Sequence, residues 1–218
     1  MNQTIPPHVL FRTPDKGLFI SFEGAEGSGK STQIQKLQKH FDSLSLPCLL
    51  LREPGGTSFG EKLRAAILSQ DSKLHPMTET FVFLASRAQL LEEKILPHLA
   101  QGGVVLLDRY IDSTLVYQAL ARQESIEKIW TLHQFAPLNV LPHRTFFLDI
   151  SLEVSLERQM KRGQNKDYFE SQSNDFQAQL LKGYRTLASL YPERIKTIQG
   201  SQSVEDVFRD ILQELSKL

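Results

Sequence analysis

The sequence is poor in cysteine and has no long apolar run. Its single cysteine, Cys48, stands next to three leucines, so neither a disulfide framework nor a cysteine-based zinc site can form, and we expect a buried, unreactive thiol. A run of about 18 apolar residues, the length that spans a bilayer, is also missing. We therefore expect a protein that does not enter a membrane and works in the reducing cytoplasm.

An excess of charge of either sign is missing as well. The 25 lysines and arginines balance the 25 aspartates and glutamates, so no global positive field favours nucleic acid as a partner. An anionic ligand must instead be held by a local cluster of cations. The chain has no N-K-x-D tetrapeptide, which a GTPase switch is expected to carry, and no long coiled-coil segment, which would suggest a motor.

The 218 residues are enough for one large domain. Five short apolar runs bounded by turn signals are predicted to be strands: Leu18–Phe22, Pro47–Leu51, Val104–Leu107, Thr145–Ile150 and Ile195–Ile198. Between these runs, apolar residues recur at the three- and four-residue spacing of a helix. Alternating strands and helices indicate an α/β fold with a mostly parallel sheet that is covered by helices on both faces.

Two segments fall outside this pattern. Residues 1–16 contain three prolines and lack the apolar stretch of a signal peptide, so we expect a loosely ordered arm before a single domain at 17–218. Residues 161–175 are polar, contain a glycine and lie between two helical patterns. This favours a mobile excursion over a core element, with a solvated surface loop as the alternative.

A glycine-rich stretch follows the first predicted strand. Residues 24–31, GAEGSGKS, match G-x-x-x-x-G-K-[ST], and a helical pattern begins directly afterwards. The glycines let the backbone curl so that successive N–H groups point into one concavity, and the helix adds the positive end of its dipole. We therefore predict a polyphosphate site, with Lys30 reaching the β- and γ-phosphates and Ser31 ligating Mg²⁺.

Charged residues also stand where two further predicted strands end. Asp108 closes the run VVLLD, where it can act near the metal or, alternatively, cap a helix. Arg109 follows Asp108, and Arg52 follows the second predicted strand. Ligands of α/β proteins bind at the carboxyl edge of the sheet, so two arginines are aimed at one crevice. The two arginines suit a phosphate monoester as acceptor. The dianion of such an acceptor needs no base to remove a proton before it attacks. Two anionic phosphate groups brought together do need cations that neutralise their charge.

With these residues assembled, the sequence resembles the thymidylate kinase family of bacteria, whose members phosphorylate dTMP to dTDP with ATP. The likeness runs from about Leu18 to the C-terminus and is carried by FEGAEGSGKST, REPGGT, FLASR, DRYIDSTLVYQ and FFLDI. REPGGT and DRYIDS together are specific to this family among nucleoside monophosphate kinases. The resemblance implies a P-loop NTPase fold with a five-stranded parallel sheet and a lid, Mg²⁺ as cofactor, and a homodimer that binds small-molecule substrates.

The resemblance also implies roles for individual residues. Those implied for ATP are Gly24, Ala25, Glu26, Gly27, Ser28, Gly29, Lys30, Ser31 and Thr32. Arg52 and Arg109 would clamp the acceptor phosphate, since the arginine fork suits phosphate better than lysine. Ser31 and Asp108 would hold the metal. Glu26 would meet the 3′-hydroxyl of the sugar, although a solvent-exposed loop charge is the alternative.

Residues implied for dTMP are Glu26, Arg52, Arg64, Phe83, Arg87, Arg109, Thr114, Tyr117 and Gln118. Phe83 would stack on thymine, and Arg87, one helical turn further on the same face, would donate to thymine O4. Thr114 and Gln118 would bond to the base edge. Tyr117 would crowd the 2′ position of the sugar and so favour deoxyribose over ribose.

The excursion at 161–175 resembles a lid that closes over ATP and excludes water. The variable P-loop positions hold no arginine, so the transition-state cation is expected from the lid, and the candidates are Arg158, Arg162 and Lys166. Arg162 could alternatively stack on adenine. In the family an arginine often follows the lid aspartate directly, but here residue 168 is a tyrosine, so Lys166 would have to take its place.

Three alternatives stay open at this point. For Arg64, an exposed helix charge is as well supported as a nucleotide contact. The enzyme could act on another deoxynucleotide, such as dUMP or dCMP. A P-loop protein could also bind nucleotide in a regulatory or scaffolding role without turning it over.

Overall fold

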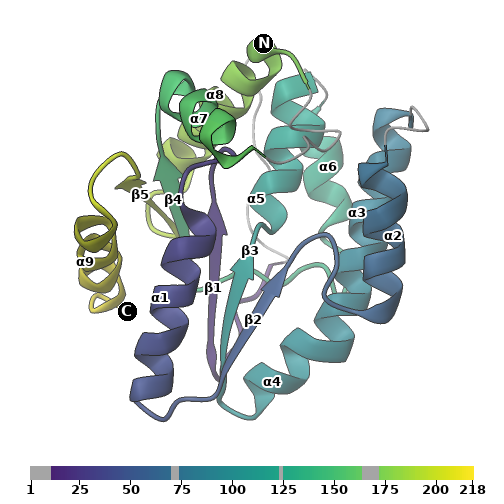
Figure 1. Ribbon diagram of the computed structural model, residues 1–218. Helices are drawn as coiled ribbons and strands as arrows, with labels where there is room; N and C mark the ends of the chain where they lie inside the picture. Colours follow the sequence, from purple (N-terminus) through teal and green to yellow (C-terminus); the bar gives the residue numbers. More distant parts are fainter. Residues whose placement is uncertain (1–10, 70–73, 123–124, 164–171) are drawn as a thin grey trace.

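The computed structural model describes residues 11–69, 74–122, 125–163 and 172–218, and a parallel sheet lies at its centre (Figure 1). The strands are β1 (Leu18–Glu23), β2 (Cys48–Arg52), β3 (Val104–Asp108), β4 (Arg144–Asp149) and β5 (Ile195–Gln199). They lie in the order β2-β3-β1-β4-β5, and every neighbouring pair is parallel. The predicted α/β fold is therefore confirmed, with each strand within one residue of its predicted bounds.

Helices connect the strands. They are α1 (Lys30–Ser43), α2 (Ser58–Leu68), α3 (Pro76–Leu90), the π-helical turn η1 (Leu91–Ile95), α4 (Leu96–Ala100), α5 (Ile111–Thr114), the π-helical turn η2 (Leu115–Ala119), the 3₁₀ turn η3 (Leu120–Arg122), α6 (Ile126–Leu132), α7 (Leu152–Arg162), α8 (Asn174–Leu190) and α9 (Val204–Leu215). Within the described ranges, no helix combines the length and the apolar character that crossing a membrane requires.

Helices cover both faces of the sheet, which explains why the central strands are apolar throughout. On one face α1 and α9 pack through residues such as Leu37 and Ile211 against Ile20 of β1. On the other face, α3, α4, α6 and α8 enclose a larger core that contains Phe19 of β1 and Trp130 of α6. Both arrangements can be followed in Figure 1, where α1 and α9 lie on one side of the sheet.

The edge strand β2 is less buried than the sequence suggests. Cys48 is half-buried and Leu50 is 40% exposed, because β2 has a neighbouring strand on one side only. The expectation of a buried Cys48 is therefore wrong. Burial is still sufficient, with the nearby charge of Asp42, to raise the pKa of the thiol to about 11, so the unreactive protonated form prevails at neutral pH.

Residues 11–14 belong to the segment expected to be a loose arm, but they pack against the domain. The rings of Phe11 and Trp130 lie 4.5 Å apart, and Arg12 forms an isolated parallel bridge with Val140. These contacts bury an aromatic ring and satisfy backbone groups, so this part of the arm is held in place. The first ten residues lie outside the described part of the chain, and for them the arm remains a prediction.

The expected lid at 161–175 lies mostly outside the described residues. Its first two residues are the end of α7, which Gly163 terminates in the left-handed conformation (φ 62°). Its last residues belong to the start of α8, where the side chain of Ser173 accepts a hydrogen bond from the N–H of Phe176.

Three neighbouring strands end side by side at one edge of the sheet. β1, β2 and β3 end at Glu23, Arg52 and Asp108, and Asp108 is in register with Phe22 on one side and with Arg52 on the other. In an open α/β sheet, ligands bind outside the carboxyl ends of the strands. The glycine-rich loop leaves β1 at this same edge.

Candidate active site

A cleft of about 710 Å³ opens at the carboxyl edge of the sheet, within the size range of small-molecule sites. Most of the residues predicted from the sequence line it: Glu26, Gly27, Gly29, Lys30, Ser31, Thr32, Arg52, Arg64, Phe83, Arg87, Asp108, Arg109, Thr114, Tyr117, Gln118 and Arg158. Predicted residues that belong to the glycine-rich loop but not to the lining are Gly24, Ala25 and Ser28. The structure thus brings together, in one cavity, segments that are up to about 130 residues apart in the sequence.

The glycine-rich loop between β1 and α1 forms one end of the cleft. Gly24 has φ 143°, and a Cβ there would lie 2.8 Å from the carbonyl oxygen of Leu148, so only glycine fits this close approach to β4. Gly29, at φ 99°, is the residue that caps α1. The side chain of Lys30 is buried and its Nζ donates to the carbonyl oxygens of Gly24 (3.2 Å) and Ala25 (3.1 Å). The N-terminus of α1 and a lysine therefore face the same space, which favours an anion.

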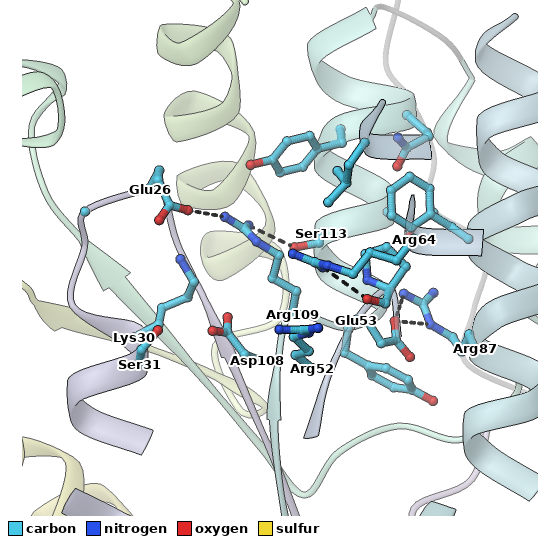
Figure 2. Close-up of a pocket in the computed structure, with 18 of the residues that line it drawn as sticks. Glu26, Lys30, Ser31, Arg52, Glu53, Arg64, Arg87, Asp108, Arg109 and Ser113 are labelled. Carbon is cyan, nitrogen blue, oxygen red and sulfur yellow. Dashed lines mark hydrogen bonds and ion pairs between the residues drawn. The ribbon is translucent and has the colours of Figure 1, made fainter. Parts of the chain in front are cut away.

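Asp108 and Ser31 lie next to this end of the cleft (Figure 2). The Oδ1 atom of Asp108 is buried and has no hydrogen-bond partner among the described residues. Carboxylate and hydroxyl oxygens are the ligands that Mg²⁺ prefers, so this donor set fits the implied metal. No group of three or more His, Cys, Asp or Glu that could hold an ion occurs in the part of the chain that the structure describes. Phosphate oxygens and water would have to complete the coordination.

Arg109 projects into the middle of the cleft. It has φ 68°, a left-handed conformation that is costly for a residue other than glycine and that often occurs at functional sites. Its Nη1 donates to the Ser113 hydroxyl (3.3 Å) and the Tyr184 hydroxyl (3.0 Å), and its Nη2 lies 3.6 Å from Oε2 of Glu26. The guanidinium also stacks over the ring of Tyr117, 5.3 Å from its centroid. These contacts fix the cation between the glycine-rich loop and the rest of the cleft (Figure 2).

A buried acid, Glu23, holds the two hydroxyl groups that contact Arg109. Glu23 is fully buried and accepts hydrogen bonds from the Ser113 hydroxyl (2.6 Å), the Tyr184 hydroxyl (3.2 Å) and the N–H of Tyr110 (2.8 Å). Burial and the charge of Asp112 raise its pKa to about 7. The same two hydroxyls contact Arg109, so Glu23 orders the groups that hold the cation.

Arg52 and Arg64 lie at the mouth of the cleft. The side chain of Arg52 is about half exposed, and its Nη2 donates to Oε2 of Glu61 at 2.9 Å. Arg64 donates from Nη1 to the carbonyl oxygen of Pro54 at 3.1 Å. Both guanidinium groups are thus at the cavity but paired with protein groups, and Arg109 is the more deeply placed cation.

The opposite end of the cleft contains the residues predicted to meet the base. Phe83, Thr114, Tyr117 and Gln118 all line it. Phe83 is partly buried and lines the cleft. The Nε2 atom of Gln118 is buried and has no hydrogen-bond partner among the described residues. A buried donor without a partner is costly, which indicates a ligand atom or a water molecule at this place.

Arg87 is fully buried at this end and has three partners. Its Nε donates to Oε2 of Glu53 at 2.8 Å, and its Nη1 lies 2.6 Å from Nε2 of His133. Its guanidinium also lies over the ring of Tyr110, 4.7 Å from the centroid. Figure 2 shows Arg87 and Glu53 pointing toward each other at the edge of the cavity. The expected contact residue is thus held by a carboxylate and a histidine that the sequence patterns did not single out.

The burial of His133 predicts a pH-dependent stability. Burial and the charge of Arg87 lower the pKa of this imidazole from 6.5 to about 3. Below pH 6.5 the unfolded chain takes up a proton that the folded chain refuses, so stability is lost as the pH falls. The free energy of unfolding, measured by denaturant titration, should decrease by about 2–3 kcal/mol more in the wild type than in His133→Gln between pH 7 and pH 4.5. Equal decreases in both proteins would contradict the buried neutral imidazole.

The structure describes the side chain of only one of the three candidate lid cations. Arg158 in α7 lines the cleft and donates from Nη1 to the carbonyl oxygens of Gly27 (3.0 Å) and Gly200 (3.1 Å), so it braces the glycine-rich loop. Arg162 is the last residue of α7, and its side chain lies outside the described part of the structure. Lys166 also lies outside that part, so the choice among the three remains a prediction.

Comparison with known proteins identifies the family of this chain. The family model described as "Thymidylate kinase" matches residues 22–211. The chain belongs to the thymidylate kinase family. Relatives named thymidylate kinase from Thermoanaerobacter sp. (strain X514) and Kosmotoga olearia are 42% and 41% identical to it, over 93% and 90% of this chain and 98% and 94% of their own length. A crystal structure of thymidylate kinase from Ehrlichia chaffeensis is similar to it with a TM-score of 0.76 at 27% identity, covering 92% of this chain and 99% of that chain.

Five residues whose side chains form the hydrogen bonds around Arg87 and Arg109 in this thymidylate kinase site were not predicted from the sequence. They are Glu23, Glu53, Ser113, His133 and Tyr184. A signal was present for the first two, because each is an acid within two residues of the carboxyl end of a predicted strand. The last two come from distant helices, and no local pattern distinguishes them from ordinary core residues.

Proposed function

We propose that this member of the thymidylate kinase family transfers the γ-phosphoryl group of Mg·ATP to dTMP, forming dTDP and ADP. The observation that carries the proposal is the position of Lys30 and Arg109 in one cleft with Phe83 and Gln118. This arrangement supports a donor polyphosphate at the glycine-rich loop and an aromatic base at the other end. Arg109 then lies where the two phosphate chains meet.

The transfer step needs positioning and charge compensation. An oxygen of the dTMP phosphate attacks the γ-phosphorus, and the bond to the β–γ bridging oxygen breaks, so that ADP leaves with the electron pair. The attacking phosphate is mostly dianionic at pH 7, and therefore no side chain has to remove a proton. Lys30 and Arg109 offset the repulsion between the two anions, with Arg52 at the mouth of the cleft as a further clamp.

The metal site is proposed at Ser31 and Asp108. When bound there, Mg²⁺ would neutralise charge on the β- and γ-phosphate oxygens of ATP. The unpartnered Oδ1 of Asp108 supports this assignment. Residues 24–32 contribute backbone N–H groups and the hydroxyls of Ser31 and Thr32 around the same phosphates.

Recognition of dTMP is proposed for the other end of the cleft. Phe83 would stack on the base, Gln118 and Thr114 would bond to its edge, and Tyr117 would leave no room for a 2′-hydroxyl. These proposals are supported by the lining of the cavity and by the buried, unpartnered Nε2 of Gln118. Glu26, next to Arg109, would accept from the 3′-hydroxyl.

Further proposals concern the lid, the assembly and the compartment. Residues 161–175 would close over ATP, with Arg158, Arg162 or Lys166 supplying the transition-state cation. A homodimer and a cytoplasmic location follow the family resemblance. Large exposed aromatic residues on the neighbouring helices α2 and α3, Phe59 (50% exposed) and Phe81 (53% exposed), support a covered surface there.

Phosphorylation of a panel of nucleoside monophosphates by the purified protein tests the proposed function. With Mg·ATP as donor, we expect dTMP to have the highest kcat/KM, ahead of dUMP, dCMP, dAMP and dGMP. A higher value for another monophosphate would assign a different substrate. Nucleotide binding without turnover of any acceptor would instead favour a regulatory P-loop protein.

A further inference from the structure

The guanidinium of Arg87 is a buried cation with a fixed orientation. Its side chain is 1% exposed, that of Glu53 is 4% exposed and His133 is fully buried. Nε and Nη2 of Arg87 both donate to Oε2 of Glu53, which holds one edge of the guanidinium plane. A buried charge must be paired and hydrogen-bonded, and Glu53 provides the opposite charge.

His133 holds a different atom of the same guanidinium. Its Nδ1 lies 2.8 Å from the carbonyl oxygen of Ile129, and because a carbonyl can only accept, Nδ1 carries the proton. Nε2 is therefore left with its lone pair and accepts from Nη1 of Arg87 at 2.6 Å. The imidazole is an acceptor toward Arg87 and is itself fixed to the last turn of α6.

The hydrogen bonds leave a defined set of free donors. Arg87 has five N–H groups, and the bonds to Glu53 and His133 use Nε–H and one N–H on each terminal nitrogen. Among the residues that the structure describes, one N–H on Nη1 and one on Nη2 remain without a partner. Arg87 lines the same cleft as Gln118 and Phe83. At the base end of the cleft, Arg87 therefore presents only hydrogen-bond donors, and their orientation is set by Glu53 and His133.

We propose that Glu53 and His133 are positioning residues that hold the free N–H groups of Arg87 toward the C4 substituent of the pyrimidine and thereby set discrimination between C4-oxo and C4-amino bases. The inference rests on the proposed function, in which dTMP occupies this end of the cleft. His133 is not among the residues that line the cleft, and Glu53 lines it beside Arg87. Each acts through Arg87.

The chemistry of the two base types gives the reason. Thymine and uracil carry a carbonyl at C4, which accepts from a guanidinium N–H, whereas cytosine carries an amino group, which is a donor. With Arg87 fixed from two sides, a C4-amino base sets donor against donor and leaves the remaining N–H groups of Arg87 without an acceptor. If one neighbour is lost, the guanidinium can rotate away, so binding of dTMP weakens and the penalty against dCMP shrinks.

The test compares dTMP and dCMP as acceptors for the wild type, His133→Leu, His133→Gln and Glu53→Leu. Leucine removes the acceptor while keeping an apolar volume, and glutamine at 133 retains an acceptor near the position of Nε2. We expect His133→Leu to raise KM for dTMP more than it lowers kcat, and to reduce the dTMP:dCMP ratio of kcat/KM by roughly 10- to 100-fold. His133→Gln should restore most of that ratio, and Glu53→Leu, which removes the oxygen that accepts from Nε and Nη2, should reduce it as His133→Leu does.

The ratio is measured on one sample, so it does not depend on the fraction of folded protein. His98→Gln, a histidine substitution in α4 outside the cleft, is the matched control and should leave the ratio unchanged. A wild-type ratio in both His133→Leu and Glu53→Leu would overturn the inference while leaving the proposed function intact. If the wild-type protein itself does not prefer dTMP, the proposed function fails, and the inference fails with it.

Discussion

Replacing Arg109 with alanine is expected to lower kcat by about 10²- to 10³-fold at saturating Mg·ATP and dTMP, since it removes one preorganised charged donor from the place where charge is compensated. Arg109 is held by Ser113, Tyr184 and Glu26, so no reorganisation is needed when the phosphates meet. Alanine is the appropriate substitution because φ is 68° at this position, and glycine would relieve backbone strain and stabilise the fold by itself. Steady-state kinetics measure the effect.

Two further variants test whether the loss is specific to the Arg109 guanidinium. Arg109→Lys keeps the charge but loses the fork that holds a phosphate with two hydrogen bonds, so an intermediate loss is expected. Arg209→Ala removes an exposed arginine on α9 that pairs with Asp206 and should leave turnover unchanged. Near-wild-type turnover of Arg109→Ala would show that this cation does not hold the acceptor phosphate.

Replacing Lys30 with alanine is expected to cost about 10²- to 10³-fold in kcat/KM for ATP. The pKa of Lys30 is lowered by its burial and by the positive charge of Arg109, so the two cations repel each other in the absence of an anion. A polyphosphate between them relieves this repulsion and gains from both charges. Kinetics with ATP as the varied substrate, together with calorimetric titration of ATP, measure the loss.

The matched control lies on the same helix. Lys36 is also part of α1, but its Nζ pairs with Glu205 at 2.6 Å on the surface, outside the cleft lining. Lys36→Ala should therefore leave both kcat/KM and ATP affinity unchanged. If Lys30→Ala and Lys36→Ala behave alike, the glycine-rich loop does not bind the donor phosphates as proposed.

The sheet and much of the site could be predicted because their signals are local. Each strand is a short apolar run between turn residues, and burial on both faces makes that run conspicuous. Asp108, Arg109 and Arg52 could be placed at one cleft because parallel strands bring their carboxyl ends to one edge. The glycine-rich loop could be recognised in the sequence because its backbone geometry requires glycine at fixed positions.

Other features depend on contacts between distant residues and carry no local signal. His133 is 46 residues from Arg87 and Tyr184 is 75 residues from Arg109, so their roles follow only from the packing of α6 and α8. The incomplete burial of Cys48 could not be predicted either, because an apolar run does not reveal that its strand lies at the edge of the sheet. The sequence pattern placed Phe11 in a loose arm, yet its ring packs against Trp130.

The central claim is that two anionic nucleotides lie face to face in one cleft, with fixed cations between them. A crystal structure of the protein with dTMP and a non-hydrolysable ATP analogue tests it most directly. We expect the triphosphate around residues 24–32 and the dTMP phosphate within hydrogen-bonding distance of Arg109, with one of its oxygens in line with the γ-phosphorus. A dTMP molecule bound elsewhere, or turned so that its phosphate points away from Arg109, would contradict the account.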